Sequence, residues 1–161
     1  MARLLIVYHS RTGGARQMAE AAHEAAREEA ETILKPACET GPEDLRAADG
    51  YLFCTPENLA ALSGEMKEFF DRCYYPVLGE IEGRGYAHMI CAGSDGEGAA
   101  RQLARIAKGW RLKEIQPPLI VCTKAQSEEE ILAEKTLSED ELAPCRELGQ
   151  ALRAGLEMGM F

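Results

Sequence analysis

Short apolar runs alternate along this chain with longer stretches in which apolar residues recur at helical spacing. Apolar residues at i, i+3, i+4 and i+7 mark one face of a helix, whereas an unbroken apolar run of four to eight residues is typical of a strand buried on both faces. By these criteria the sequence predicts five strands, over residues 4–8, 32–35, 51–54, 86–91 and 119–122.

Helices are predicted between and after these strands. The segment from Ala15 to about Glu29 carries small apolar residues on one face and charged residues on the other. Residues 45–48 predict a weak helical turn, residues 63–73 a helix that begins at a capping serine, and residues 100–107 a further helix.

The last part of the chain predicts two more helices. Ser127 and Glu130 form a capping box before a short acidic helix. The final helix has leucines on one face up to residue 156, and Ser138 offers a capping box at its start. Because Pro144 would then lie inside the helix, we expect a break there or a start nearer Glu141.

Five strands separated by helix-length connections predict parallel pairing. The chain has no internal repeat and no linker rich in Gly, Ser or Pro, so we expect one doubly wound α/β domain over residues 1–161. In such a sheet, ligands bind at the carboxyl ends of the strands. With the strand order 2-1-3-4-5, the loops 9–15, 55–62 and 92–98 would meet at that edge.

Charge and cysteine content narrow the classes of function. The 161 residues include 18 basic and 27 acidic ones, a net charge of −9 that disfavours binding to nucleic acid or to an anionic membrane surface. The apolar start shows no signal-peptide pattern, and no run is long enough to span a bilayer, so we expect a soluble cytoplasmic protein. The six cysteines form no C-x-x-C pair; we expect free thiols and no metal site.

The loop after the first strand is the strongest candidate for chemistry. It contains Ser10, Thr12 and the consecutive glycines Gly13 and Gly14 just before a helix. Glycine lets backbone amides turn inward, and a helix N-terminus attracts anions, so the loop suits a phosphate. The loop lacks the Walker lysine and the G-x-G-x-x-G spacing. A plain strand-to-helix turn with glycine for geometry explains the same residues.

Two motifs resemble known flavoproteins. Ser10-Arg11-Thr12-Gly13-Gly14 resembles the FMN phosphate loop of the flavodoxin-like superfamily. Thr55-Pro56-Glu57 and the stretch from Ser63 to Arg72 resemble the NAD(P)H-dependent FMN reductases and the flavodoxin-like quinone reductases. A well-capped amphipathic helix alone also accounts for the second stretch. The resemblance implies a flavodoxin-like five-stranded parallel sheet, FMN as cofactor and NAD(P)H as electron donor.

The resemblance also implies the positions of the cofactor contacts. The phosphate loop would surround the ribityl phosphate, and two later loops would line the two sides of the isoalloxazine ring. The implied residues are, for the phosphate, Ser10, Arg11, Thr12, Gly13, Gly14 and Ala15; for one side of the ring, Pro56, Glu57, Asn58 and Leu59; for the other, Gly93, Ser94, Asp95 and Gly96. No catalytic side chain is implied, since the flavin carries the redox chemistry.

Three functions fit this pattern. The first is a two-electron NAD(P)H-dependent oxidoreductase with a quinone or flavin acceptor, and relatives of this kind form dimers or tetramers. The second is a one-electron carrier, which the loop 55–60 disfavours because it has neither glycine nor an aromatic residue. The third is an interaction module with weak or lost FMN affinity, motivated by Ala15 in place of a hydroxyl residue and by the absence of stacking aromatics. A receiver domain is set aside because Cys54 ends the third strand where that class needs Asp.

Overall fold

The structure is a computed structural model that describes residues 1–27 and 31–161. Its sheet contains the parallel strands β1 (Leu4–Tyr8), β2 (Thr32–Pro36), β3 (Gly50–Asn58) and β5 (Gly85–Ala92). The short strands β6 (Lys113–Glu114) and β7 (Leu119–Cys122) both pair with β5 and share the fifth position. The order β2-β1-β3-β5-β6 confirms the predicted order 2-1-3-4-5.

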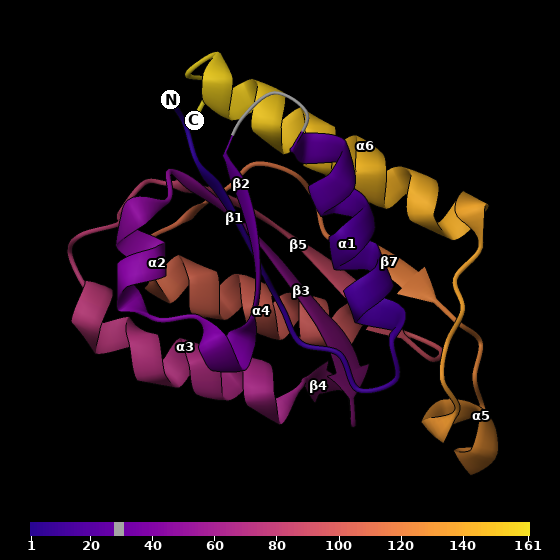
Figure 1. The fold of residues 1–161 in the computed structure, drawn as a ribbon. Helices are drawn as coiled ribbons and strands as arrows, with labels where there is room; N and C mark the ends of the chain where they lie inside the picture. Colours follow the sequence, from indigo (N-terminus) through magenta and orange to yellow (C-terminus); the bar gives the residue numbers. More distant parts are fainter. Residues whose placement is uncertain (28–30) are drawn as a thin grey trace.

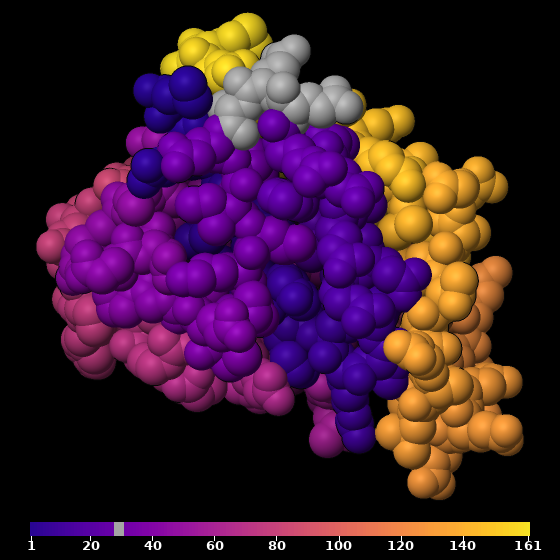
Figure 2. Space-filling view, viewed as in Figure 1, coloured from indigo at the N-terminus to yellow at the C-terminus, as the bar shows by residue number. Residues whose placement is uncertain are grey.

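Helices cover both faces of the sheet (Figure 1). On one face lie α1 (Gly14–Ala26) and α6 (Glu139–Glu157), and on the other lie α2 (Pro42–Ala47), α3 (Gly64–Val77) and α4 (Glu97–Gly109). The short elements η1 (Ala37–Glu39) and α5 (Glu128–Leu132) follow β2 and β7. In the space-filling view, the orange residues around α5 project beside the indigo start of α1 (Figure 2).

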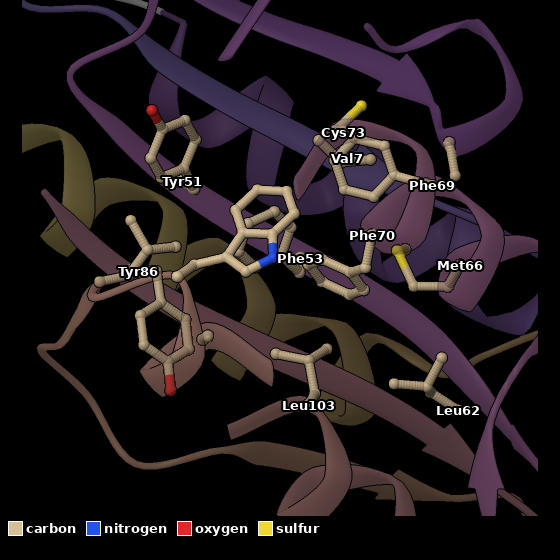
Figure 3. Packing of buried hydrophobic residues seen from close by; sticks show 14 of the residues in the cluster. Val7, Tyr51, Phe53, Leu62, Met66, Phe69, Phe70, Cys73, Tyr86 and Leu103 are labelled. Carbon is tan, nitrogen blue, oxygen red and sulfur yellow. The ribbon is translucent and has the colours of Figure 1, made fainter. Parts of the chain in front are cut away.

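An aromatic cluster fills the face covered by α3 and α4 (Figure 3). The ring of Phe70 lies 5.1 Å from that of Phe53 and 5.3 Å from that of Trp110, and the rings of Phe69 and Phe70 are also 5.1 Å apart. Edge-to-face and tilted arrangements at these distances add to the stabilisation from burial. The spacing that predicted α3 therefore corresponds to the side of the helix that packs on β3.

One prediction about the helices is wrong. Pro144 neither breaks α6 nor delays its start, because the helix runs from Glu139 to Glu157 with Ser138 as its N-cap. The carbonyl that Pro144 leaves without a donor belongs to Asp140, in the exposed first turn, where water can bond it. The predicted end of the first helix near Glu29 falls among residues 28–30, outside the described residues, and the assigned helix ends at Ala26.

Two strands were not predicted from the sequence. β3 continues to Asn58 and turns back into β4 (Ala61–Leu62), which pairs with it in an antiparallel hairpin. β6 holds only Lys113 and Glu114, too short for any apolar pattern. None of the described helices combines the length and the hydropathy that crossing a bilayer requires.

Candidate functional site

Residues of the three predicted loops meet at the carboxyl edge of the sheet. They line a narrow cleft of about 60 Å³, together with residues that follow β7. The lining residues from the three loops are Ser10, Arg11, Thr12, Gly14, Ala15, Pro56, Glu57, Asn58, Ala92 and Gly93. A wider hollow of about 400 Å³ opens on the other side of the first loop and shares Ser10, Arg11 and Thr12 with the cleft.

The first loop forms a cradle of backbone amides. Gly13 has a φ of 96°, in the left-handed region that glycine adopts without strain, and its N–H donates to Ser10 Oγ over 3.0 Å. Helix α1 begins at the next residue, with no side-chain cap and no acidic residue in its first turn. The amides of Gly14, Ala15 and Arg16 have no acceptor among the described residues. Free amides at the positive end of a helix make a binding site for an anion.

Close packing under the loop requires glycine at position 14. A Cβ atom there would lie 2.5 Å from Cys91 Sγ, on β5. Burial raises the pKa of Cys91 to about 11, so its thiol stays protonated near neutral pH and acts as a packing group. The Cys54 thiol, whose pKa burial also raises, donates to the Ala15 carbonyl over 3.2 Å. Both cysteines therefore support the loop from beneath.

Glu57 ties the second loop to the third. Its Oε1 accepts the N–H of Gly96 over 2.9 Å and its Oε2 accepts the N–H of Ala99 over 3.1 Å. The carboxylate therefore takes the place of an N-cap for α4, whose own N-cap residue, Gly96, offers no side chain. The N-terminus of α4 already holds the Glu57 carboxylate, whereas no carboxylate of the described residues bonds the N-terminus of α1.

The turn of the β3–β4 hairpin follows Asn58, which lines the cleft. Leu59 and Ala60 adopt φ values of 51° and 63°, which cost strain for residues with a Cβ atom. The side chain of Leu59 is fully exposed and does not line the cleft. Ser94 and Asp95 are also exposed and lie outside the lining residues. Of the implied ring contacts, the cleft therefore brings together Pro56, Glu57, Asn58 and Gly93.

His9 connects the phosphate loop to the start of α3. Its Nδ1 lies 2.8 Å from Ser63 Oγ, and its Nε2 lies 3.0 Å from a carboxylate oxygen of Glu65. Ser63 also accepts the N–H of Met66 over 3.3 Å, which confirms it as the N-cap of α3. Burial lowers the pKa of His9, and the charge of Glu65 acts in the opposite direction. His9 thus anchors the loop rather than standing free in the hollow.

Sequence reasoning missed the wall formed by the residues after β7. Thr123, Ala125, Ile131 and Lys135 line the cleft, although they follow the first loop by more than a hundred positions. The sequence shows only a short capped helix there, and periodicity does not place a surface helix against a particular loop.

Comparison with known proteins defines first the class and then the family. Solved structures with the same fold include a flavodoxin from the domain Archaea, with a TM-score of 0.78 and 16% identity over 96% of this chain and 99% of that one. The WrbA-like flavodoxin of Agrobacterium tumefaciens also has a TM-score of 0.78, with 18% identity over 98% of this chain and 99% of that one. The fold is therefore flavodoxin-like.

Sequence comparison narrows the class further. A flavodoxin of Aquifex aeolicus is 32% identical over 94% of this chain and 85% of its own length. An NAD(P)H dehydrogenase (quinone) of Acidithiobacillus ferrooxidans is 35% identical over 45% of this chain and 47% of its own length. The NADPH-dependent FMN reductase family matches residues 17–126, and the chain belongs to that family. It is an FMN-binding flavoprotein.

Residues of the site suit the phosphate end of FMN. The cradle offers three amides without acceptors and the hydroxyls of Ser10 and Thr12, which are the donors that a phosphate needs. The ring end is narrower than the roughly 300 Å³ or more of typical ligand pockets. A bound tricyclic ring would therefore require the loops of the cleft to separate.

Proposed function

We propose that this chain is an oxidoreductase that uses bound FMN to pass two electrons from NAD(P)H to a quinone or a free flavin. The observation that carries the proposal is the uncapped amide cradle at α1, in a chain of the FMN reductase family. The relative described as an NAD(P)H dehydrogenase (quinone) supports both the donor and the acceptor class.

Residues of the cradle would hold the phosphate and those of the cleft would position the ring. Ser10, Thr12 and the amides that follow Gly13 would bind the phosphate, with Arg11 at the rim. Pro56 and Asn58 would lie on one side of the ring and Gly93 on the other. Bound FMN would supply the hydride-transfer and electron-transfer chemistry, so the chain needs no acid or base of its own for this transfer. The chain supplies orientation and a site shielded from water.

A one-electron carrier is the second candidate, since the Aquifex relative is described as a flavodoxin. The β3–β4 turn favours the reductase. Such carriers commonly have a flexible glycine-containing turn and flanking aromatic residues at the ring, whereas here the turn is Leu59-Ala60 and Glu57 binds it to α4.

The activity is tested by following NADH and NADPH oxidation spectrophotometrically with FMN-loaded protein and a water-soluble benzoquinone. Turnover that requires both FMN and the quinone is expected. Gly14→Ala, which places a Cβ atom against Cys91, should abolish FMN binding and activity together, whereas Gly64→Ala, where a Cβ atom has open space, should change neither.

Two results would contradict the proposal. FMN-loaded protein that oxidises neither nucleotide but exchanges electrons with a reduced partner protein would establish the carrier. Protein that stays colourless with FMN, and whose melting temperature FMN leaves unchanged, would contradict FMN-dependent activity and favour an interaction module.

We also propose that the chain works as a cytoplasmic homodimer or homotetramer in which a second copy covers the ring. Six free cysteines support a reducing compartment. Leu59 is fully exposed and follows the cleft residue Asn58, where a second copy would cover it. A monomeric mass by light scattering with FMN present would contradict the assembly.

A further inference from the structure

The residues after α5 are bound to the phosphate loop and to the first turns of α1. The N–H of Lys135 donates to the Thr12 carbonyl over 2.8 Å. Gln17, on α1, holds the same segment with both ends of its amide. Its Nε2 donates to the Lys135 carbonyl over 2.7 Å, and its Oε1 accepts the N–H of Leu137 over 2.9 Å. These bonds fix the backbone at Lys135 next to the cradle.

The side chain of Lys135 carries its charge to the same place. Its Nζ lies 3.5 Å from Thr12 Oγ1 and the residue lines the cleft. The ammonium also donates to the carbonyls of Glu130, Ile131 and Ala133 at the end of α5, over 2.8, 3.0 and 2.5 Å. These bonds occupy its three N–H groups, so a phosphate oxygen would take the place of one of the carbonyls. Lys135 has no carboxylate partner among the described residues.

Apart from Lys135, the charges around the cradle disfavour binding of a phosphate dianion. The chain carries a net charge of −9, and Glu65 and Glu134 border the hollow beside the cradle. Of the two arginines nearby, Arg11 is exposed and Arg16 lies 3.7 Å from its helix neighbour Glu20. A half-buried ammonium is screened less by salt than these exposed groups. Lys135 is therefore the cation best placed to balance a phosphate.

We propose that Lys135 is a phosphate-recognition residue, which contacts the phosphate group of the ligand in the α1 cradle and makes the site select FMN over riboflavin. This inference rests on the proposed function for the identity of the ligand. The sequence predicted a phosphate site formed by the first loop alone. The inference adds Lys135, which lies more than a hundred positions further along the chain.

The test is a pair of titrations, with FMN and with riboflavin, on the refolded or FMN-stripped full chain. Lys135→Gln should weaken FMN about 10- to 100-fold, as expected for the loss of a hydrogen bond to a charged group, and should change the riboflavin dissociation constant less than twofold. Lys135→Arg should restore most of the FMN affinity. Lys108→Gln, which removes an exposed lysine from the last turn of α4, controls for the change in net charge.

The ratio of the two dissociation constants separates recognition from structure. If Lys135→Gln weakens FMN and riboflavin equally, the lysine only supports α5 and the inference is wrong. It is also wrong if the FMN affinity is unchanged while the unaltered chain still prefers FMN to riboflavin. An unaltered chain that binds neither flavin would overturn the proposed function, and this inference with it.

Discussion

Replacing Glu57 with alanine tests how the two loops of the cleft are held together. The change removes both acceptors for the amides of Gly96 and Ala99 and leaves α4 without an N-cap. The loss of a cap costs about 0.5–2 kcal/mol, and a hydrogen bond to a charged group contributes about 1.5–3 kcal/mol. Because water can solvate part of the freed amides, we expect a net loss of about 2–4 kcal/mol in the free energy of unfolding.

For a chain of this size, 1 kcal/mol corresponds to about 2–4 °C in melting temperature, so Glu57→Ala should melt about 5–15 °C lower. Glu57→Gln keeps one uncharged acceptor and should lose about half as much. Urea unfolding and calorimetry without cofactor measure both variants. The control is Glu97→Gln, an exposed first-turn residue of the same helix, for which we expect a few tenths of a kcal/mol.

A destabilisation of Glu57→Ala below about 0.5 kcal/mol would refute the reasoning, because two bonds to a carboxylate cannot both be lost at so little cost. Equal losses for Glu57→Ala and Glu97→Gln would refute it as well. That result would show a general effect of charge at this helix end and no specific cap.

Three further predictions concern packing, pH and thiol reactivity. Gly149→Ala should lower the free energy of unfolding in urea by about 2 kcal/mol, since its Cβ atom would overlap the backbone of α1. Gly64→Ala, where the Cβ atom has open space, should leave it unchanged. His88 is fully buried and burial lowers its pKa, so the unfolded chain binds its proton more readily; the free energy of unfolding should fall as pH drops below about 6.5, with a smaller slope in His88→Leu. Iodoacetamide at pH 7.5, followed by mass spectrometry, should label exposed Cys38 well before Cys91, whose pKa is about 11, and equal rates would contradict the assignment.

The sequence predicted the elements whose apolar residues are buried, on both faces of a strand or on one face of a helix. The strand 4–8 and the strand 119–122 have the bounds expected from their apolar runs, and Ser63 caps α3 as its residue type indicated. The order of the sheet followed from helix-length connections. The strands that were missed are two residues long, so that pairing with neighbouring strands, and not a local pattern, defines β4 and β6.

The sequence predicted which loops form the candidate site, but not the side-chain contacts that join them. Glycines and hydroxyl residues marked the cradle, because they are the residues that local backbone geometry and a phosphate require. The roles of Glu57 and Lys135 depend on partners 39 and 123 positions away, at Gly96 and Thr12. Single-sequence reasoning does not detect such pairs, since nothing near either residue differs from an ordinary exposed charge.

The two hydrogen bonds from Gln17 to the segment 135–137 also bear on when the chain can bind its cofactor. Translation delivers β1 and the glycine loop before this segment, so a nascent chain that lacks the segment holds only part of the cleft. The cleft is complete only once residues 135–137 have docked on α1, and we expect the flavin to be captured after that step.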